Sequence, residues 1–167
     1  MTRAAWGARL VACCVAAALS ACALPPRIDA GLAPGDVLRT GRLALSVQDQ
    51  PGQSFSAGFE LRGRPARGAL TLLNPLGGTI AVLHWQPGSA TFESQGREPR
   101  QFPSLEAMVE QATGAAMPVA ALFDWLAGVP AAVPGWEPDL SGLADGRLRA
   151  HRLQPTPEAD LRVVLDR

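Results

Sequence analysis

The sequence predicts an α+β domain: an open antiparallel β-sheet, or incomplete barrel, with short helices covering an apolar cavity. Two features of the pattern predict this fold class. From Arg42 onward, apolar and polar residues alternate in short segments separated by turns rich in glycine and proline. Between residues 104 and 128 the alternation gives way to a helical period. Helices set between groups of strands are typical of α+β domains, and helices over a curved sheet leave room for an apolar cavity.

Length and composition indicate one domain. The chain has 167 residues, of which 47% are hydrophobic and 18% charged, and residues 37–167 are expected to share a single core. The formal net charge is zero, and the basic residues, all arginine, are spread along the chain without a dense run. A nucleic-acid partner is therefore not expected, because binding a phosphate backbone requires a concentrated basic surface.

Residues 1–21 differ in kind from the rest of the chain. Arg3 and Arg9 lie before an apolar run from Leu10 to Leu19, and no acidic residue occurs before Asp29. A charged start followed by an apolar run of about ten residues is the pattern of a secretory signal peptide. The run is too short to span a bilayer, which takes about 20 apolar residues in a helix. We therefore predict that residues 1–21 are a signal peptide.

The end of this segment, Leu19-Ser20-Ala21-Cys22, resembles a bacterial lipobox, in which the signal peptide is cut just before a lipidated cysteine. The alternative is ordinary cleavage near the small residues, which leaves Cys22 as a free thiol. The lipobox interpretation is preferred, and it makes residues 22–36, rich in proline and glycine, a lipidated tether. Ala23 stands where an aspartate retains lipoproteins at the inner membrane. The expected location is therefore the periplasmic face of the outer membrane.

Five strands are expected in the first part of the domain. Alternation marks them at residues 42–48, 54–62, 69–73, 79–85 and 90–94. Turns rich in proline and glycine join them, so that neighbours in sequence are expected to pair antiparallel. Two further strands, at 146–153 and 161–165, are expected to follow a proline-rich stretch over 130–138 and to close the sheet.

Two short helices are expected between these groups of strands. In the first, Leu105, Met108, Val109 and Ala112 share one face behind a possible Ser104 cap, and the run stops at Gly114. The second begins with Pro118 in its first turn and ends before Gly128. Its apolar face would consist of Val119, Leu122, Phe123 and Leu126.

The sequence carries no pattern that indicates catalysis, a cofactor or a metal site. His84 and His151 have no ligand-type residue at a metal-binding spacing. The segment Gly52–Ser56 comes nearest to a nucleophile elbow but lacks the second glycine, and a phosphate-binding loop would need a lysine, which the chain does not have. Glu106 and Glu110, four residues apart on the first helix, are typical of a solvated face. We therefore expect a protein that is not an enzyme.

Apolar residues in unusual positions remain as candidates. Leu76 lies between a proline and two glycines, and its side chain could stand out into solvent or pack on the sheet edge; the loop alone favours packing. Trp85, Trp125 and Trp136 are interpreted as core residues, with an apolar ligand cavity as the alternative.

Three segments then match a known family in order and spacing. Leu72–Thr79, Gln86–Gly88 and the end of the second helix, Trp125–Pro130, resemble the LolB outer-membrane lipoprotein receptors, and the similarity extends over about residues 40–130. The resemblance implies a LolA/LolB-like open barrel whose cavity accepts the acyl chains of lipoproteins from the periplasmic carrier LolA. The cargo is then inserted into the outer membrane. Leu76 matches the protruding loop leucine of that family, which reverses the preference for a packed side chain.

The resemblance also suggests which side chains line the acyl cavity. The candidates are the residues expected to face inward on the strands and on the second helix: Leu43, Leu45, Phe59, Leu61, Leu72, Val82, Phe123 and Leu126. A monomer is expected. Two other functions stay open: an outer-membrane structural or assembly lipoprotein that binds a protein partner, and a lipid-active hydrolase, which would need a serine within hydrogen-bond reach of a histidine.

Overall fold

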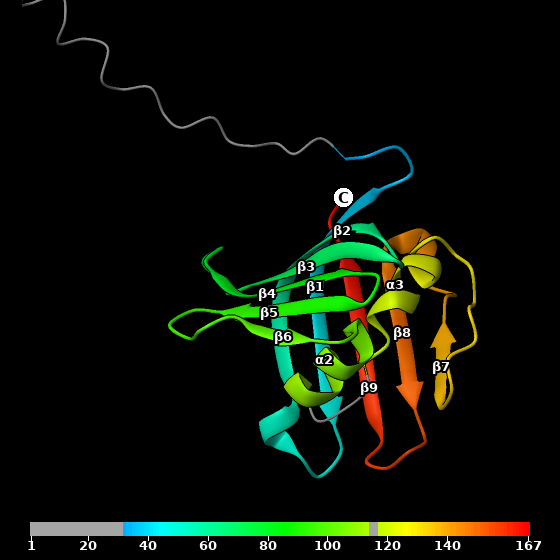
Figure 1. Cartoon of the computed structure of the whole chain (residues 1–167). Helices are drawn as coiled ribbons and strands as arrows, with labels where there is room; N and C mark the ends of the chain where they lie inside the picture. Colours follow the sequence, from blue (N-terminus) through cyan, green and yellow to red (C-terminus); the bar gives the residue numbers. More distant parts are fainter. Residues whose placement is uncertain (1–31, 114–116) are drawn as a thin grey trace, which may run out of the picture. The chain divides into compact units, whose positions relative to one another are not determined.

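The computed structural model describes residues 32–113 and 117–167, and Leu32–Arg167 form one compact unit (Figure 1). The predicted signal peptide and Cys22 lie outside the described residues. The strands are β1 (Val37–Val47), β2 (Phe55–Arg64), β3 (Arg67–Leu73), β4 (Thr79–Gln86), β5 (Ser89–Ser94), β6 (Arg100–Phe102), β7 (Trp136–Asp139), β8 (Arg147–Arg152) and β9 (Ala159–Leu165). The helices are α2 (Leu105–Thr113) and α3 (Val119–Leu126), with short 3-10 turns η2 (Pro51–Gln53) and η3 (Leu143–Asp145).

All nine strands of the described chain belong to one antiparallel sheet, in the order β6-β5-β4-β3-β2-β1-β9-β8-β7. The first strand thus lies next to the last one, and the sheet curves around the helices while β6 and β7 remain its two edges (Figure 1). Gly41 allows β1 and β9 to approach closely, because a Cβ at this position would lie 2.1 Å from the carbonyl oxygen of Val164. The predicted α+β class with an open, incomplete barrel is confirmed.

Both edge strands were absent from the sequence prediction. β6 has three residues, too few to show alternation. β7 lies in the stretch read as proline-rich, and it contains Pro138. Proline lacks the N–H that a central strand needs, but an edge strand tolerates it. β7 pairs only with β8 among the described strands, so Pro138 fits there.

The two helices occur where the helical period predicts them. The Ser104 hydroxyl accepts a hydrogen bond from the Ala107 backbone N–H at 3.2 Å, which satisfies one of the free donors at the start of α2. Pro118 occupies the N-cap position of α3. No helix of the described residues is long and apolar enough to cross a membrane.

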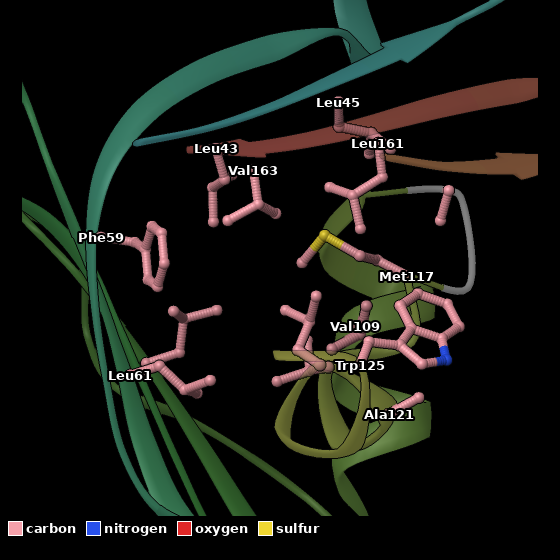
Figure 2. Close-up of a cluster of buried hydrophobic side chains, with 14 of the residues drawn as sticks. Leu43, Leu45, Phe59, Leu61, Val109, Met117, Ala121, Trp125, Leu161 and Val163 are labelled. Carbon is pink, nitrogen blue, oxygen red and sulfur yellow. The ribbon is translucent and has the colours of Figure 1, made fainter. Parts of the chain in front are cut away.

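The core lies between the concave face of the sheet and the two helices. Figure 2 shows side chains from β1, β2 and β9, among them Leu43 and Phe59, pointing toward Val109 of α2 and Trp125 of α3. Trp125 is fully buried, and its indole N–H donates to the carbonyl of Ala131 at 2.9 Å. Burying an aromatic side chain of this size with its polar atom satisfied strongly favours one position of α3 against the sheet.

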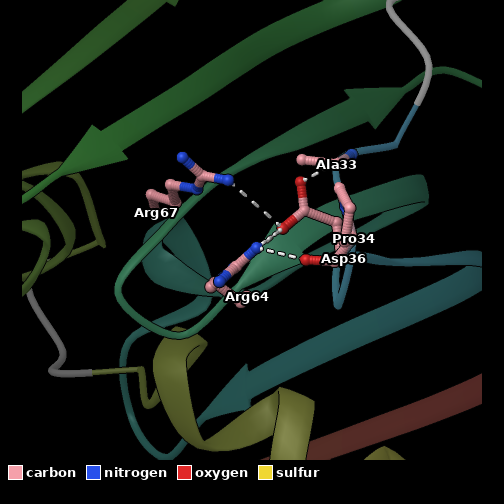
Figure 3. A network of polar contacts seen from close by, with 5 residues as sticks. All are labelled: Ala33, Pro34, Asp36, Arg64 and Arg67. Atoms are coloured by element: carbon pink, nitrogen blue, oxygen red, sulfur yellow. Dashed lines mark hydrogen bonds and ion pairs between the residues drawn. The ribbon is translucent and has the colours of Figure 1, made fainter.

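The residues just before β1 are also fixed to the domain (Figure 3). The Asp36 carboxylate accepts a hydrogen bond from Arg64 at 2.8 Å, and Arg67 lies 3.9 Å from the same oxygen. Arg64 also donates to the carbonyl of Pro34 at 2.8 Å. The hydrogen bond from Arg64 to Asp36, together with the charge of Arg64, holds the pKa of the Asp36 carboxyl below its ordinary value. The end of the predicted tether is thereby bound to the β2–β3 turn.

Candidate functional site

An apolar pocket of about 540 Å³ opens between the sheet and α2. Its apolar lining consists of Phe55, Ala57, Leu70, Leu72, Ile80, Ala81, Leu83, Phe92, Val109 and Met117. Its polar lining residues are Gln53, Ser54 and Ser56, from η2 to the start of β2, and Gln111 of α2. Largely apolar walls with few polar groups suit a ligand that is recognised by its apolar surface.

Most of the predicted cavity residues lie beside this pocket, in the packed core. Leu72 is the one candidate that lines it. The candidates on β1 and β2, together with those on α3, are buried and in the core cluster: Leu43, Leu45, Phe59, Leu61, Phe123 and Leu126. Their inward facing agrees with the alternation of the strands, and their role toward acyl chains stays a prediction.

The inward facing predicted for Val82 is wrong. Val82 is half-buried and pairs with Thr71 on the outer face of the sheet, whereas its neighbours Ala81 and Leu83 are buried and line the pocket. Successive strand residues point to opposite faces of the sheet. An assignment of inward and outward positions that is shifted by one residue therefore reverses the facing of every residue on the strand. In β4 every residue from Thr79 to Leu83 except the first is apolar, so alternation did not indicate which of them face inward.

A β-bulge at the start of β4 changes the direction of Ile80. Leu72 pairs with Ala81 and Leu73 pairs with Thr79, so that Ile80 is the extra residue of the pair β3–β4. A bulge turns a side chain away from simple alternation, and Ile80 lines the apolar pocket together with its neighbour Ala81. The Ile80 side chain is also 43% exposed. It therefore borders both the pocket and solvent, and no signal in the sequence distinguished it.

The loop between β3 and β4 presents Leu76 to solvent. The Asn74 side-chain oxygen accepts hydrogen bonds from the backbone N–H groups of Leu76 and Gly78, each at 2.9 Å. Gly77 adopts a φ of 82°, which glycine permits at little cost. The loop is thus a rigid turn, and Leu76 at its tip is 95% exposed. Leu76 does not pack on the sheet edge.

The three tryptophans weighed for a ligand role are core residues. Trp85, Trp125 and Trp136 are all buried, and none of them lines the apolar pocket. Trp85 packs edge-on against Phe123, with ring centroids 6.1 Å apart, and its N–H donates to the carbonyl of Pro65 at 2.9 Å. Their rings therefore stabilise the fold that surrounds the pocket.

Groups that would support catalysis do not come together in the described part of the chain. His151 contacts two exposed carboxylates, Asp160 at 3.1 Å and Glu158 at 3.7 Å. Neither histidine is hydrogen-bonded to a serine among the described residues, and these residues include no cluster of three or more metal-ligating side chains. The geometry thus offers an apolar binding site.

This fold and pocket define a class of protein: an open β-barrel whose helices cover an apolar space on the concave face of the sheet. Comparison with known families matches residues 38–155 to the model described as "Outer membrane lipoprotein LolB". The chain therefore belongs to the LolB family. It is a lipid-anchored lipoprotein of the outer membrane.

Individual relatives agree with this assignment. The Outer-membrane lipoprotein LolB of Bordetella petrii is 37% identical over 127 residues, which cover 74% of this chain and 64% of the relative. That of Cupriavidus pinatubonensis is 38% identical over 149 residues, covering 84% of this chain and 70% of the relative. The match to the Bordetella petrii protein thus spans less than two thirds of that relative's length.

Proposed function

We propose that this protein is the outer-membrane receptor that accepts lipoproteins from the periplasmic carrier LolA and inserts them into the outer membrane. The observation that carries the proposal is the combination of an apolar pocket of about 540 Å³ with a leucine 95% exposed on a rigid loop close to it. The pocket suits an acyl chain, and the exposed leucine suits contact with a bilayer. Cys22 is the proposed lipidation site.

Transfer of this kind requires no bond to be broken. Acyl chains move toward the site that removes more of their surface from water, so successive differences in affinity are sufficient to drive them from carrier to receptor to bilayer. Recognition through apolar contact also makes the receptor indifferent to the sequence of the cargo protein. The cargo is thus identified by its lipid.

Ile80 suggests the direction in which a bound chain leaves. It lines the pocket, it is partly exposed, and it is the second residue of β4 after the loop that carries Leu76. An acyl chain passing over Ile80 would therefore stay in contact with apolar surface until it reaches the part of the protein that enters the bilayer. We propose the start of β4 as the place where a bound acyl chain leaves the pocket.

The proposal is tested with two variants of adjacent residues on β3. Leu72 lines the pocket, whereas Leu73 has its Cβ on the outer face, near Gly58. Leu72→Trp places a larger ring in the pocket and is expected to weaken binding of a fluorescent fatty acid and acceptance of a lipoprotein from loaded LolA. Leu73→Trp adds the same ring outside and should leave both unchanged.

Equal effects of the two variants, with both melting at the wild-type temperature, would reject the pocket as the acyl site. If the wild-type protein binds no fatty acid and takes no cargo from LolA, the receptor function itself is rejected. The reading as a structural or assembly lipoprotein would then take its place.

A further inference from the structure

A group of four arginines occupies the outer face of three neighbouring strands. Arg42 is on β1, Arg162 on β9, and Arg147 and Arg149 on β8, and all four are exposed. β9 lies between β1 and β8, as Figure 1 shows. We call these four residues the arginine patch.

The strand register brings the members of the patch side by side. In one row, Val164 of β9 lies between Arg42 and Arg147; in the next row, Arg162 is directly opposite Arg149. Directly opposite side chains have Cβ atoms about 5 Å apart, and like charges in such positions destabilise a sheet. The patch therefore has an electrostatic cost in the free domain.

Acidic side chains neutralise the patch only in part. None of its four arginines forms an ion pair within the described residues. Asp139 is directly opposite Arg149 on β7 and accepts a hydrogen bond from the Ser141 backbone N–H at 3.0 Å. Its hydrogen bonds with Ser141 and, to a smaller extent, the charge of Arg149 hold the pKa of the Asp139 carboxyl below its ordinary value. Asp160, two positions before Arg162, lies 3.1 Å from His151. Asp139 thus offsets part of the charge of Arg149, whereas Arg42, Arg147 and Arg162 have no acidic side chain among their paired residues.

The patch also has an apolar centre. Val164 is 49% exposed between Arg42 and Arg147. Side chains on one face of a sheet stand roughly parallel, so the guanidinium groups and Val164 form a broad surface. A broad basic surface with an apolar residue in it matches a layer of anionic headgroups better than it matches a single small anion.

We propose that the arginine patch binds the anionic phospholipid surface of the membrane that carries the protein. This contact goes beyond acyl transfer and does not depend on it. The outer-membrane location of the family places the ligand nearby, and fourteen residues separate Cys22 from Val37, a chain that spans at most about 50 Å when extended. A domain held this close meets the bilayer at a high effective concentration.

The test uses the mature chain from residue 22 with Cys22→Ala, so that no lipid anchors it; the whole described core lies within this chain. Sedimentation with neutral phosphatidylcholine vesicles is compared with sedimentation with vesicles containing phosphatidylglycerol. The patch variant is Arg42→Gln with Arg162→Gln. Its control, Arg97→Gln with Arg100→Gln, removes the same charge from residues at the other end of the sheet.

The wild type and the control are expected to bind the anionic vesicles in a salt-sensitive manner. The patch variant should bind about 25-fold more weakly, because each arginine near an anionic surface contributes roughly a factor of five. The same difference should persist when Leu76→Ser is added to both variants, which separates this contact from the Leu76 loop. The patch variant should also melt at a temperature no lower than the wild type, since it loses like-charge repulsion.

Three results would overturn the proposal. The first is equal binding of patch and control variants to anionic vesicles. The second is wild-type binding that is the same for neutral and anionic vesicles. The third is the absence of vesicle binding together with patch-dependent binding of a poly-glutamate peptide, which would assign the surface to an acidic protein.

Discussion

Replacing Leu76 with alanine is expected to weaken the membrane step of the protein without affecting its folding. The side chain is 95% exposed, so it contributes almost nothing to the core. If it enters a bilayer, the change removes three carbon groups from a buried position, and at about 0.8 kcal/mol each the loss is about 2.4 kcal/mol, or roughly 50-fold in partitioning. Stability to urea should change by less than about 0.5 kcal/mol, as is usual for exposed positions.

The assay loads the protein with a fluorescent acylated peptide and follows its transfer to vesicles by stopped flow. Leu76→Ala should load normally and transfer slowly, and Val129→Ala, at another exposed apolar position, should transfer like the wild type. Transfer at the wild-type rate by Leu76→Ala would refute the role of this side chain. A drop in stability as large as that of a core variant would show instead that the loop is packed in solution.

Three further changes test other parts of the argument. Ile80→Ser should reduce the rate of acyl release roughly tenfold, measured in the same transfer assay, because it removes apolar surface at the proposed exit. Asp36→Asn should lower the melting temperature at neutral pH, because Arg64 holds the pKa of Asp36 below its ordinary value of 3.8 in the folded protein. The difference in melting temperature from wild type should shrink as the pH falls below 3.8, and it should disappear below the lowered pKa. Arg152→Met should leave the urea midpoint nearly unchanged. The variant loses the hydrogen bond from Arg152 to the Pro157 carbonyl at 2.8 Å, and this loss is offset because a neutral chain of similar size avoids burying a charge whose Nε is unpaired among the described residues.

Alternation and helical period were enough to predict the central part of the fold. Each of the strands β1 to β5, β8 and β9 was expected, as were both helices, because apolar residues recur in these segments at strand or helical spacing between turn residues. Among these predicted elements only the ends differed: β1 begins at Val37, before its clear alternation at Arg42. The first part of β1 pairs with β2 up to Gly63. This pairing, and not the sequence pattern, determines its extended conformation.

The pocket was harder to predict than the fold. Alternation states which side chains face inward, but it does not state which of them are covered by a helix and which border a gap. Leu43 and Leu72 both face inward, yet Leu43 is 1% exposed in the core while Leu72 lines the pocket. The difference depends on where α2 lies across the sheet, which is a matter of tertiary packing. A bulge such as the one at Ile80 also escapes a pattern that assumes a strict period of two.

If the proposed function holds, the position of α2 accounts for the way a largely filled interior would accept a lipid. The helix lines the pocket through Val109 and Gln111, and Met117 follows it in the chain; of these, Val109 and Met117 are buried apolar side chains. Its hydrogen bond to the sheet, from Arg100 to Gln111 at 2.9 Å, lies at the exposed rim. An acyl chain that displaces Val109 or Met117 from the sheet would replace one apolar contact with another of similar area, and the net free energy of the exchange would be small. Small net changes are what a receptor needs if it must release its cargo after accepting it, because a chain held in a deep, permanently open cavity would be bound too tightly to pass on to the bilayer.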